Sequence, residues 1–201
     1  GCICWLACSA VSGDIIGEEN QWCGPDLLNT KCILAWAKNP YRSFPLTGWF
    51  LQAALDRGVK LIVVDPRYTD SARHATVWLP VRPGTDAALA LSIIQVIIEE
   101  NLYDKHFVEQ WTNASYLVRS DTDLLLRESD VKPDGDENKY IVWDSAANTY
   151  KLAGCPGETG TDLALTGTYT VENIVCQPVF QRLIDQVQPY SPEKAEEIHW
   201  V

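Results

Sequence analysis

Runs of apolar residues without polar alternation recur at three places in the first half of the chain. They are CILAWA at 32–37, KLIVVD at 60–65 and VWLPV at 77–81. Strands that are buried on both faces of a parallel sheet have this pattern, whereas half-exposed strands alternate. The proline in the third run indicates an edge or a strand end. We therefore expect three short strands of a mostly parallel sheet.

Amphipathic stretches separate and follow these runs. Residues 48–57, GWFLQAALDR, predict a helix that ends at Gly58, the residue type preferred just past a helix C-terminus. Residues 86–101 predict a longer helix capped by Thr85, and residues 103–111 a shorter one. Strands alternating with helices indicate an α/β fold, a doubly wound, Rossmann-like sheet.

The second half changes character. YIVWD and TYKLA flank a Ser-Ala-Ala-Asn turn and predict an inserted β-hairpin, preceded by an exposed acidic loop, KPDGDEN. Residues 171–175 predict a single return strand, 178–187 a helix, and Ser191-Pro192 the start of another. The expected organisation has four parts: a metal-ligand loop and connection (1–31), a dinucleotide-binding α/β domain (32–112), an inserted loop and hairpin (113–170), and a return strand with helices (171–201).

Composition narrows the class of partner. The formal net charge of −11 over 201 residues makes nucleic acid and anionic membranes poor partners. We find no stretch of about 18 uncharged apolar residues, so we expect no membrane span in this chain. Seven cysteines, crowded toward the N-terminus as C-x-C-x3-C, do not match a disulfide framework or a zinc ribbon. One of these thiols as a metal ligand and all of them as buried small residues both remain open.

Two carboxylates stand where ligands bind in such folds. Asp65 ends one predicted strand and Asp86 follows the next, and open α/β sheets bind ligands beyond the carboxyl ends of their strands. A carboxylate there accepts both hydroxyls of a ribose, or the N1–H and exocyclic amine of guanine. The pair fits a nucleotide. The alternative interpretation makes Asp65 part of a turn and Asp86 a helix-dipole residue.

Other catalytic patterns are missing. The sequence contains no G-x-G-x-x-G and no P-loop, so phosphates would need a backbone turn with Lys38, Arg42 or Arg67. We find no Ser/His/Asp constellation, and we interpret the three histidines, His74, His106 and His199, as surface residues.

The motifs together resemble one family. VVDPRYTDSARHATVWLPVRPGTDAALAL, IIEENLYDKHFVEQW and LNTKCILAWAKNP are similar to the pterin-dinucleotide domain of molybdenum and tungsten enzymes of the dimethyl sulfoxide reductase family. In the family's W-G-x-N-P turn, Ala37 stands here in place of the usual glycine. The resemblance implies bis-molybdopterin guanine dinucleotide holding Mo or W.

The resemblance also assigns residues to parts of that cofactor. The turn that meets one dinucleotide would comprise Trp36, Lys38, Asn39 and Pro40. The ribose and phosphate end would be held by Asp65, Pro66, Arg67 and Thr69. The guanine would be recognised by Gly84, Thr85 and Asp86. The metal ligand would be Cys4, which lies 35 residues before Asn39, with Cys8 and then Cys2 as the alternatives.

The resemblance implies an internal fragment of a larger catalytic subunit. The longer protein is expected to contribute a 4Fe–4S cluster, a second dinucleotide site, a small-molecule substrate funnel and contacts to an iron–sulfur electron-transfer subunit. Redox chemistry is the first hypothesis, and a non-redox tungsten hydratase resembling acetylene hydratase is the second. A nucleotide-binding module without metal, and a subunit that lost its cofactor, stay as further alternatives. Compartment, cytoplasmic or periplasmic, is left open.

Overall fold

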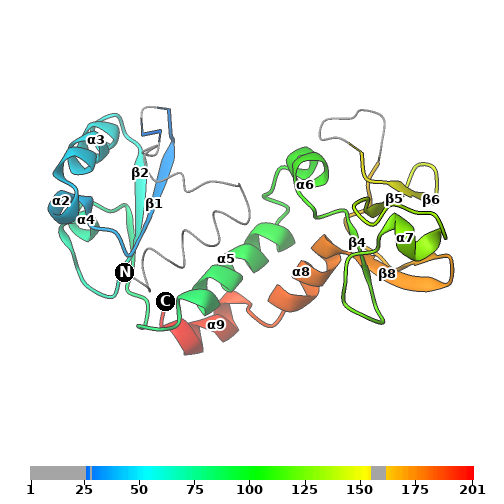
Figure 1. Ribbon diagram of the computed structural model, residues 1–201. Coiled ribbons are helices and arrows are strands. Elements are labelled where there is room, and N and C mark those ends of the chain that lie inside the picture. Colours follow the sequence, from blue (N-terminus) through cyan, green and yellow to red (C-terminus); the bar gives the residue numbers. More distant parts are fainter. Residues whose placement is uncertain (1–25, 28, 155–161) are drawn as a thin grey trace. The chain divides into compact units, whose positions relative to one another are not determined.

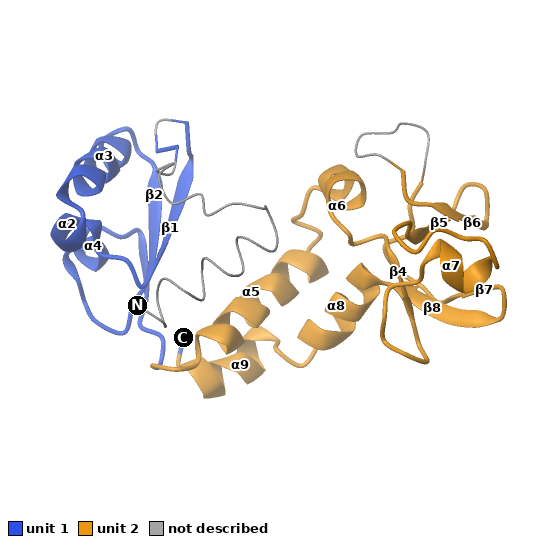
Figure 2. Cartoon of the chain, in the orientation of Figure 1, with its two compact units in different colours: residues 1–82, 201 blue, residues 83–200 orange. Residues whose placement is uncertain are grey.

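The computed structural model describes residues 26–27, 29–154 and 162–201. The chain forms two compact units, one up to Arg82 together with Val201, the other covering 83–200 (Figure 2). The division falls inside the range 32–112. No described helix is long and apolar enough to cross a bilayer.

The first unit is a three-stranded parallel sheet with helices (Figure 1). Its strand order is β1-β2-β3, and Cys32 to Trp36 pair in register with Lys60 to Val64. The elements of this unit are β1 (Cys32–Trp36), α2 (Pro40–Ser43), α3 (Pro45–Asp56), β2 (Lys60–Val64), α4 (Asp70–Arg73) and β3 (Val77–Leu79). All three predicted parallel strands are therefore confirmed.

Helices α3 and α4 cover one face of this sheet. Leu51 and Ala54 of α3 and Ala72 of α4 pack with Leu61 and Val63 of β2 in a single apolar cluster. The alternate residue Leu34 on β1 is 51% exposed. Both crossovers move the chain in the same direction across the sheet, which places their helices on the same face. The α/β class is confirmed, whereas a doubly wound arrangement is not confirmed among the described residues.

Helix α3 begins earlier than expected and ends where expected. Pro45 occupies its first position, where the missing N–H costs nothing, so the helix starts three residues before Gly48. Gly58 follows it with φ +85° and donates its N–H to Leu55 O at 2.8 Å, while Val59 N donates to Ala54 O at 3.2 Å. This pair of bonds is the Schellman motif, which favours glycine at that position.

The second unit combines five described helices with small antiparallel sheets. Its elements are α5 (Asp86–Glu99), α6 (Lys105–Trp111), β4 (Leu117–Arg119), α7 (Glu128–Val131), β5 (Ile141–Asp144), β6 (Thr149–Leu152), β7 (Tyr169–Val171), β8 (Ile174–Pro178), α8 (Val179–Val187) and α9 (Pro192–His199). Helix α5 packs against α8 and α9. The predicted hairpin is confirmed as β5 and β6, which share an apolar cluster with the sheet β4-β8-β7.

Three expectations for this unit are wrong. The return strand predicted at 171–175 is broken, because Glu172 and Asn173 have φ of 46° and 69° and form a two-residue turn between β7 and β8. Thr85 stands at the N-cap of α5 but makes no side-chain capping hydrogen bond. His199, expected at the surface, is 2% exposed, and its burial lowers the pKa of the imidazole.

Candidate dinucleotide site

The carboxyl ends of β1 and β2 bring two of the predicted segments together. Trp36 pairs with Val64 at the last position of both strands, and Ala37 N donates to Val64 O at 2.8 Å. Lys38 and Asp65 therefore leave the sheet from adjacent strand ends. This is the place where an open parallel sheet binds ligands.

The turn after β1 depends on an unusual backbone conformation. Ala37 has φ +49°, in the left-handed region that costs a non-glycine residue about 1–2 kcal/mol. The chain then reverses, so that Asn39 precedes α2 and Pro40 fills the first helical position. Lys38 is exposed, with its Nζ 5.8 Å from the ring centroid of Phe44. The turn thus presents a cation and a carboxamide next to each other.

The turn after β2 uses half of the Asp65 carboxylate. Oδ1 accepts the backbone N–H of Arg67 at 2.8 Å, which closes an Asx turn around Pro66. The backbone oxygen of Asp65 accepts Trp78 Nε1 at 2.8 Å. Oδ2 has no hydrogen-bond partner within the described chain, and the guanidinium of Arg67 is exposed. One carboxylate oxygen and one cation thus stay available to a ligand.

Helix α4 fastens these two turns to each other. Thr69 Oγ1 caps it by accepting Ala72 N at 3.2 Å. Ser71, fully buried, donates its hydroxyl to Asn39 Oδ1 at 3.0 Å and its backbone N–H to the same oxygen at 3.4 Å. Asp70 forms an ion pair with Arg42 of α2. The pKa of the Asp70 carboxyl is held below its usual range, first by the Arg42 hydrogen bond.

The remaining expected residues do not belong to these two turns. Gly84, Thr85 and Asp86 belong to the second unit, at the start of α5, where Gly84 has φ +85° and Asp86 is exposed in the first helical turn. The candidate metal ligands Cys4, Cys8 and Cys2 lie outside the described residues. Within the described ranges, no three His, Cys, Asp or Glu side chains gather as a metal site would require.

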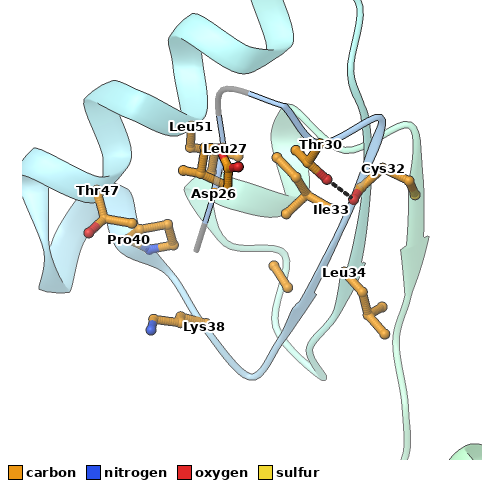
Figure 3. A pocket seen from close by; sticks show the side chains of 11 residues that line it. Asp26, Leu27, Thr30, Cys32, Ile33, Leu34, Lys38, Pro40, Thr47 and Leu51 are labelled. Carbon is orange, nitrogen blue, oxygen red and sulfur yellow. Dashed lines mark hydrogen bonds between the residues drawn. The ribbon is translucent and has the colours of Figure 1, made fainter. Parts of the chain in front are cut away.

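A cavity of about 280 Å³ lies beside β1 and shares two residues with the turn (Figure 3). Lys38 and Pro40 line one side, and Thr30, Cys32 and Leu34 lie across from them (Figure 3). The lining is mostly apolar. Thr30 Oγ1 donates to the Cys32 backbone oxygen at 2.8 Å. The cavity thus widens the space beside the turn but adds few polar groups to it.

Sequence reasoning missed the residues that hold the turns in place. Ser71, Asp70 and Trp78 were not singled out, although Thr69 followed by Asp-Ser-Ala has the composition of a helix start. The contact of Ser71 with Asn39 spans 32 positions and leaves no local signal.

Comparison with known proteins identifies the family. A model of the molybdopterin oxidoreductase family matches residues 6–182. The chain belongs to this family. It is 33% identical over 227 residues to the perchlorate reductase alpha subunit of Dechloromonas aromatica, covering 92% of this chain and 24% of that protein. It is also 33% identical to the chlorate reductase alpha subunit of Ideonella dechloratans, covering 92% of this chain and 21% of that one.

Acetylene hydratase is similar over a shorter stretch. The protein from Syntrophotalea acetylenica is 66% identical over 61 residues, which are 30% of this chain and 8% of that protein. The structure of the hydratase from Pelobacter acetylenicus matches with a TM-score of 0.49 and 29% identity, covering 87% of this chain and 15% of that one. The chain spans less than a quarter of the length of each of these relatives.

Proposed function

We propose that this chain is part of the catalytic subunit of a Mo or W oxidoreductase, in which it holds one arm of bis-molybdopterin guanine dinucleotide and supplies a cysteine ligand to the metal. One observation carries the proposal: in a chain of the molybdopterin oxidoreductase family, the turns after β1 and β2 leave adjacent strand ends, and each carries polar groups suited to a ligand. When bound, the cofactor supplies oxygen-atom or hydride-equivalent transfer at its metal.

The polar groups of the first unit fit the phosphate and ribose part of such a ligand. Lys38 and Arg67 are exposed cations, suited to a pyrophosphate. Asp65 Oδ2 is an acceptor suited to a ribose hydroxyl, while Oδ1 keeps the turn closed. The residues of this chain would therefore bind and orient the dinucleotide, and would leave the redox chemistry to the metal.

The guanine end is assigned to the turn before α5. Asp86 would accept the N1–H and the exocyclic amine of guanine in parallel, a pattern that adenine does not offer. Gly84 and Thr85 would shape the backbone beside it.

For the fold, we propose that further elements of the longer protein complete the doubly wound sheet. The metal ligand is assigned to Cys4, with Cys8 and Cys2 as alternatives.

Parts of the enzyme outside this chain would supply the other cofactors and the electron transfer. The longer protein would carry the 4Fe–4S cluster and the second dinucleotide site, and an iron–sulfur subunit would take or deliver electrons. A non-redox hydratase is the second candidate, favoured by the 66% identity to acetylene hydratase over 61 residues. Hydration of acetylene by the full-length protein without any electron acceptor would decide for it.

The proposal is tested by the cofactor content of the full-length protein. Purified protein should contain Mo or W by elemental analysis, oxidised pterin by fluorescence, and GMP after mild acid hydrolysis. Asp86→Ala should lower the GMP content, because it leaves buried guanine donors unmatched at a cost of about 1–3 kcal/mol. Glu193→Ala is the matched control, an exposed first-turn acid of α9 in the same unit.

Three further variants test the roles of Asp65 and Cys4. Asp65→Asn keeps an oxygen for the Arg67 N–H but removes the charge, whereas Asp65→Ala also opens the turn. Cys4→Ala should change the metal's sulfur coordination in X-ray absorption. A normal spectrum would move the ligand to Cys8 or Cys2, and full GMP content in Asp86→Ala would remove the guanine role.

A further inference from the structure

We infer that Ser71 is a positioning residue that turns the Asn39 carboxamide so that its N–H donors face the bound dinucleotide. The inference rests on the proposed function. It starts from the two hydrogen bonds that Asn39 Oδ1 accepts, one from the Ser71 hydroxyl at 3.0 Å and one from the Ser71 backbone N–H at 3.4 Å.

The chemistry of the donors fixes the orientation of the amide. A hydroxyl pairs with either end of a carboxamide, but a backbone N–H only donates. The atom facing the Ser71 N–H must therefore be the oxygen of Asn39, and Nδ2 must point the other way. Within the described residues Nδ2 has no hydrogen-bond partner, and Asn39 is half-buried. Two N–H donors are thus left at the strand ends for an acceptor.

Ser71 is itself held rigidly. It is fully buried in the first turn of α4, which Thr69 caps and which the Asp70–Arg42 ion pair ties to α2. Because Ser71 is fully buried and its hydroxyl donates to Asn39, we assign it no ligand contact of its own. The donors of Asn39 lie next to Lys38, so this corner of the site favours an acceptor oxygen of the dinucleotide over a donor group.

Asn39→Asp changes the nitrogen end of this amide, which faces the ligand, and keeps an oxygen at the end that contacts Ser71. One carboxylate oxygen would still accept both Ser71 donors, so the contact with α4 is kept. The other would replace two N–H donors with a negatively charged acceptor facing the ligand. Asp70→Asn is the opposite control, since it weakens the tie between α4 and α2 through Arg42 without touching Asn39.

The experiment measures release of the dinucleotide and of metal from the full-length holoenzyme during dilution with chelator, the dinucleotide being assayed as GMP after mild acid hydrolysis of the protein-free fraction. Asn39→Asp should release both at least about tenfold faster while its thermal unfolding stays near wild type. Ser71→Ala loses the shorter hydroxyl bond at 3.0 Å and holds the Asn39 amide by the 3.4 Å backbone bond alone, so it should speed release about fivefold, with no further effect when Asn39 is already alanine. Asp70→Asn should change release less than Ser71→Ala does.

Three outcomes overturn the inference. They are a wild-type release rate in Asn39→Asp, a Ser71→Ala effect that persists with alanine at 39, or equal effects of Ser71→Ala and Asp70→Asn. If Ser71→Ala fails to fold, the Asn39→Asp result decides. Wild-type protein that contains metal but no GMP, or neither, overturns the proposed function instead, so the two failures are distinguishable.

Discussion

Alanine at Gly84 and at Gly58 should cost the same stability but differ in their effect on the cofactor. Both glycines have φ +85°, and a Cβ built on either meets no atom within 4 Å. The cost of a side chain is therefore conformational and not steric. Placing alanine in this region costs about 1–2 kcal/mol, offset by about 0.4–1 kcal/mol from a less flexible unfolded chain. The expected net loss is about 1 kcal/mol at each site.

Hydrogen exchange in the full-length protein measures this loss locally. The amide of Val59, which donates to Ala54 O, reports on Gly58, and the amide of Ala88, which donates to Thr85 O, reports on Gly84. Each should exchange about fivefold faster in its own variant, since 1 kcal/mol is roughly that factor in the opening equilibrium. GMP content should fall only in Gly84→Ala, because only that turn is assigned to the guanine.

Two results would refute the reasoning. Unchanged hydrogen exchange of the Val59 amide in Gly58→Ala would mean that the backbone there accepts alanine without strain. The stability loss estimated for Gly84→Ala would then be wrong as well, because it rests on the same reasoning. Equal GMP content in the two variants, with equal losses of protection, would leave the strain argument standing and remove the turn before α5 from the guanine site.

Three other outcomes are expected. Ala37→Gly should stabilise the chain by up to about 1 kcal/mol, seen as slower exchange of its amide to Val64 O, because glycine relieves the positive φ; faster exchange would contradict the strain. The pKa of Asp70 is lowered in the folded state, so its ion pair with Arg42 stabilises the fold fully above about pH 4, and this stabilisation is lost as the pH falls through the folded-state pKa. The difference in urea midpoint between wild type and Asp70→Asn should therefore shrink below about pH 4. A difference that stays constant with pH would show that the charge of Asp70 does not contribute to stability. Burial raises the pKa of the Cys176 thiol to about 11, so iodoacetamide at pH 8 should label exposed Cys32 first and Cys176 only after unfolding, as mass spectrometry of the peptides would show.

Local signals predicted most of the regular structure. Unbroken apolar runs predict the strands β1, β2 and β3. The end of α3 is predicted by Gly58, because glycine readily adopts the positive φ found there. The break between β7 and β8 was missed because Glu172 is not a residue type that signals a positive φ. His199 was placed outside because nothing in its neighbouring sequence reveals what packs over α9.

The candidate site likewise has a part that local sequence signals predict and a part that depends on tertiary structure. Asp65 and Asn39 could be found from the sequence because each follows a strand and carries groups that a ligand needs. The arrangement of the two turns in space could not be found from the sequence, because it depends on the pairing of β1 with β2 and on the hydrogen bonds from α4. The division between Arg82 and Pro83 also could not be read from a stretch that continues without a glycine- or serine-rich linker.

Ser71 shows why orienting residues escape a search based on available chemistry. Such a search looks for donors and acceptors that a ligand could reach, and Ser71 has none, because it is fully buried and donates both its hydroxyl and its N–H to Asn39. Its effect is to decide which end of another side chain remains available. A buried polar residue whose hydrogen bonds end on a candidate ligand-binding group is therefore the feature to look for once a structure is known, and Asn39→Asp tests that rule at this site by keeping the buried contact while reversing the exposed face.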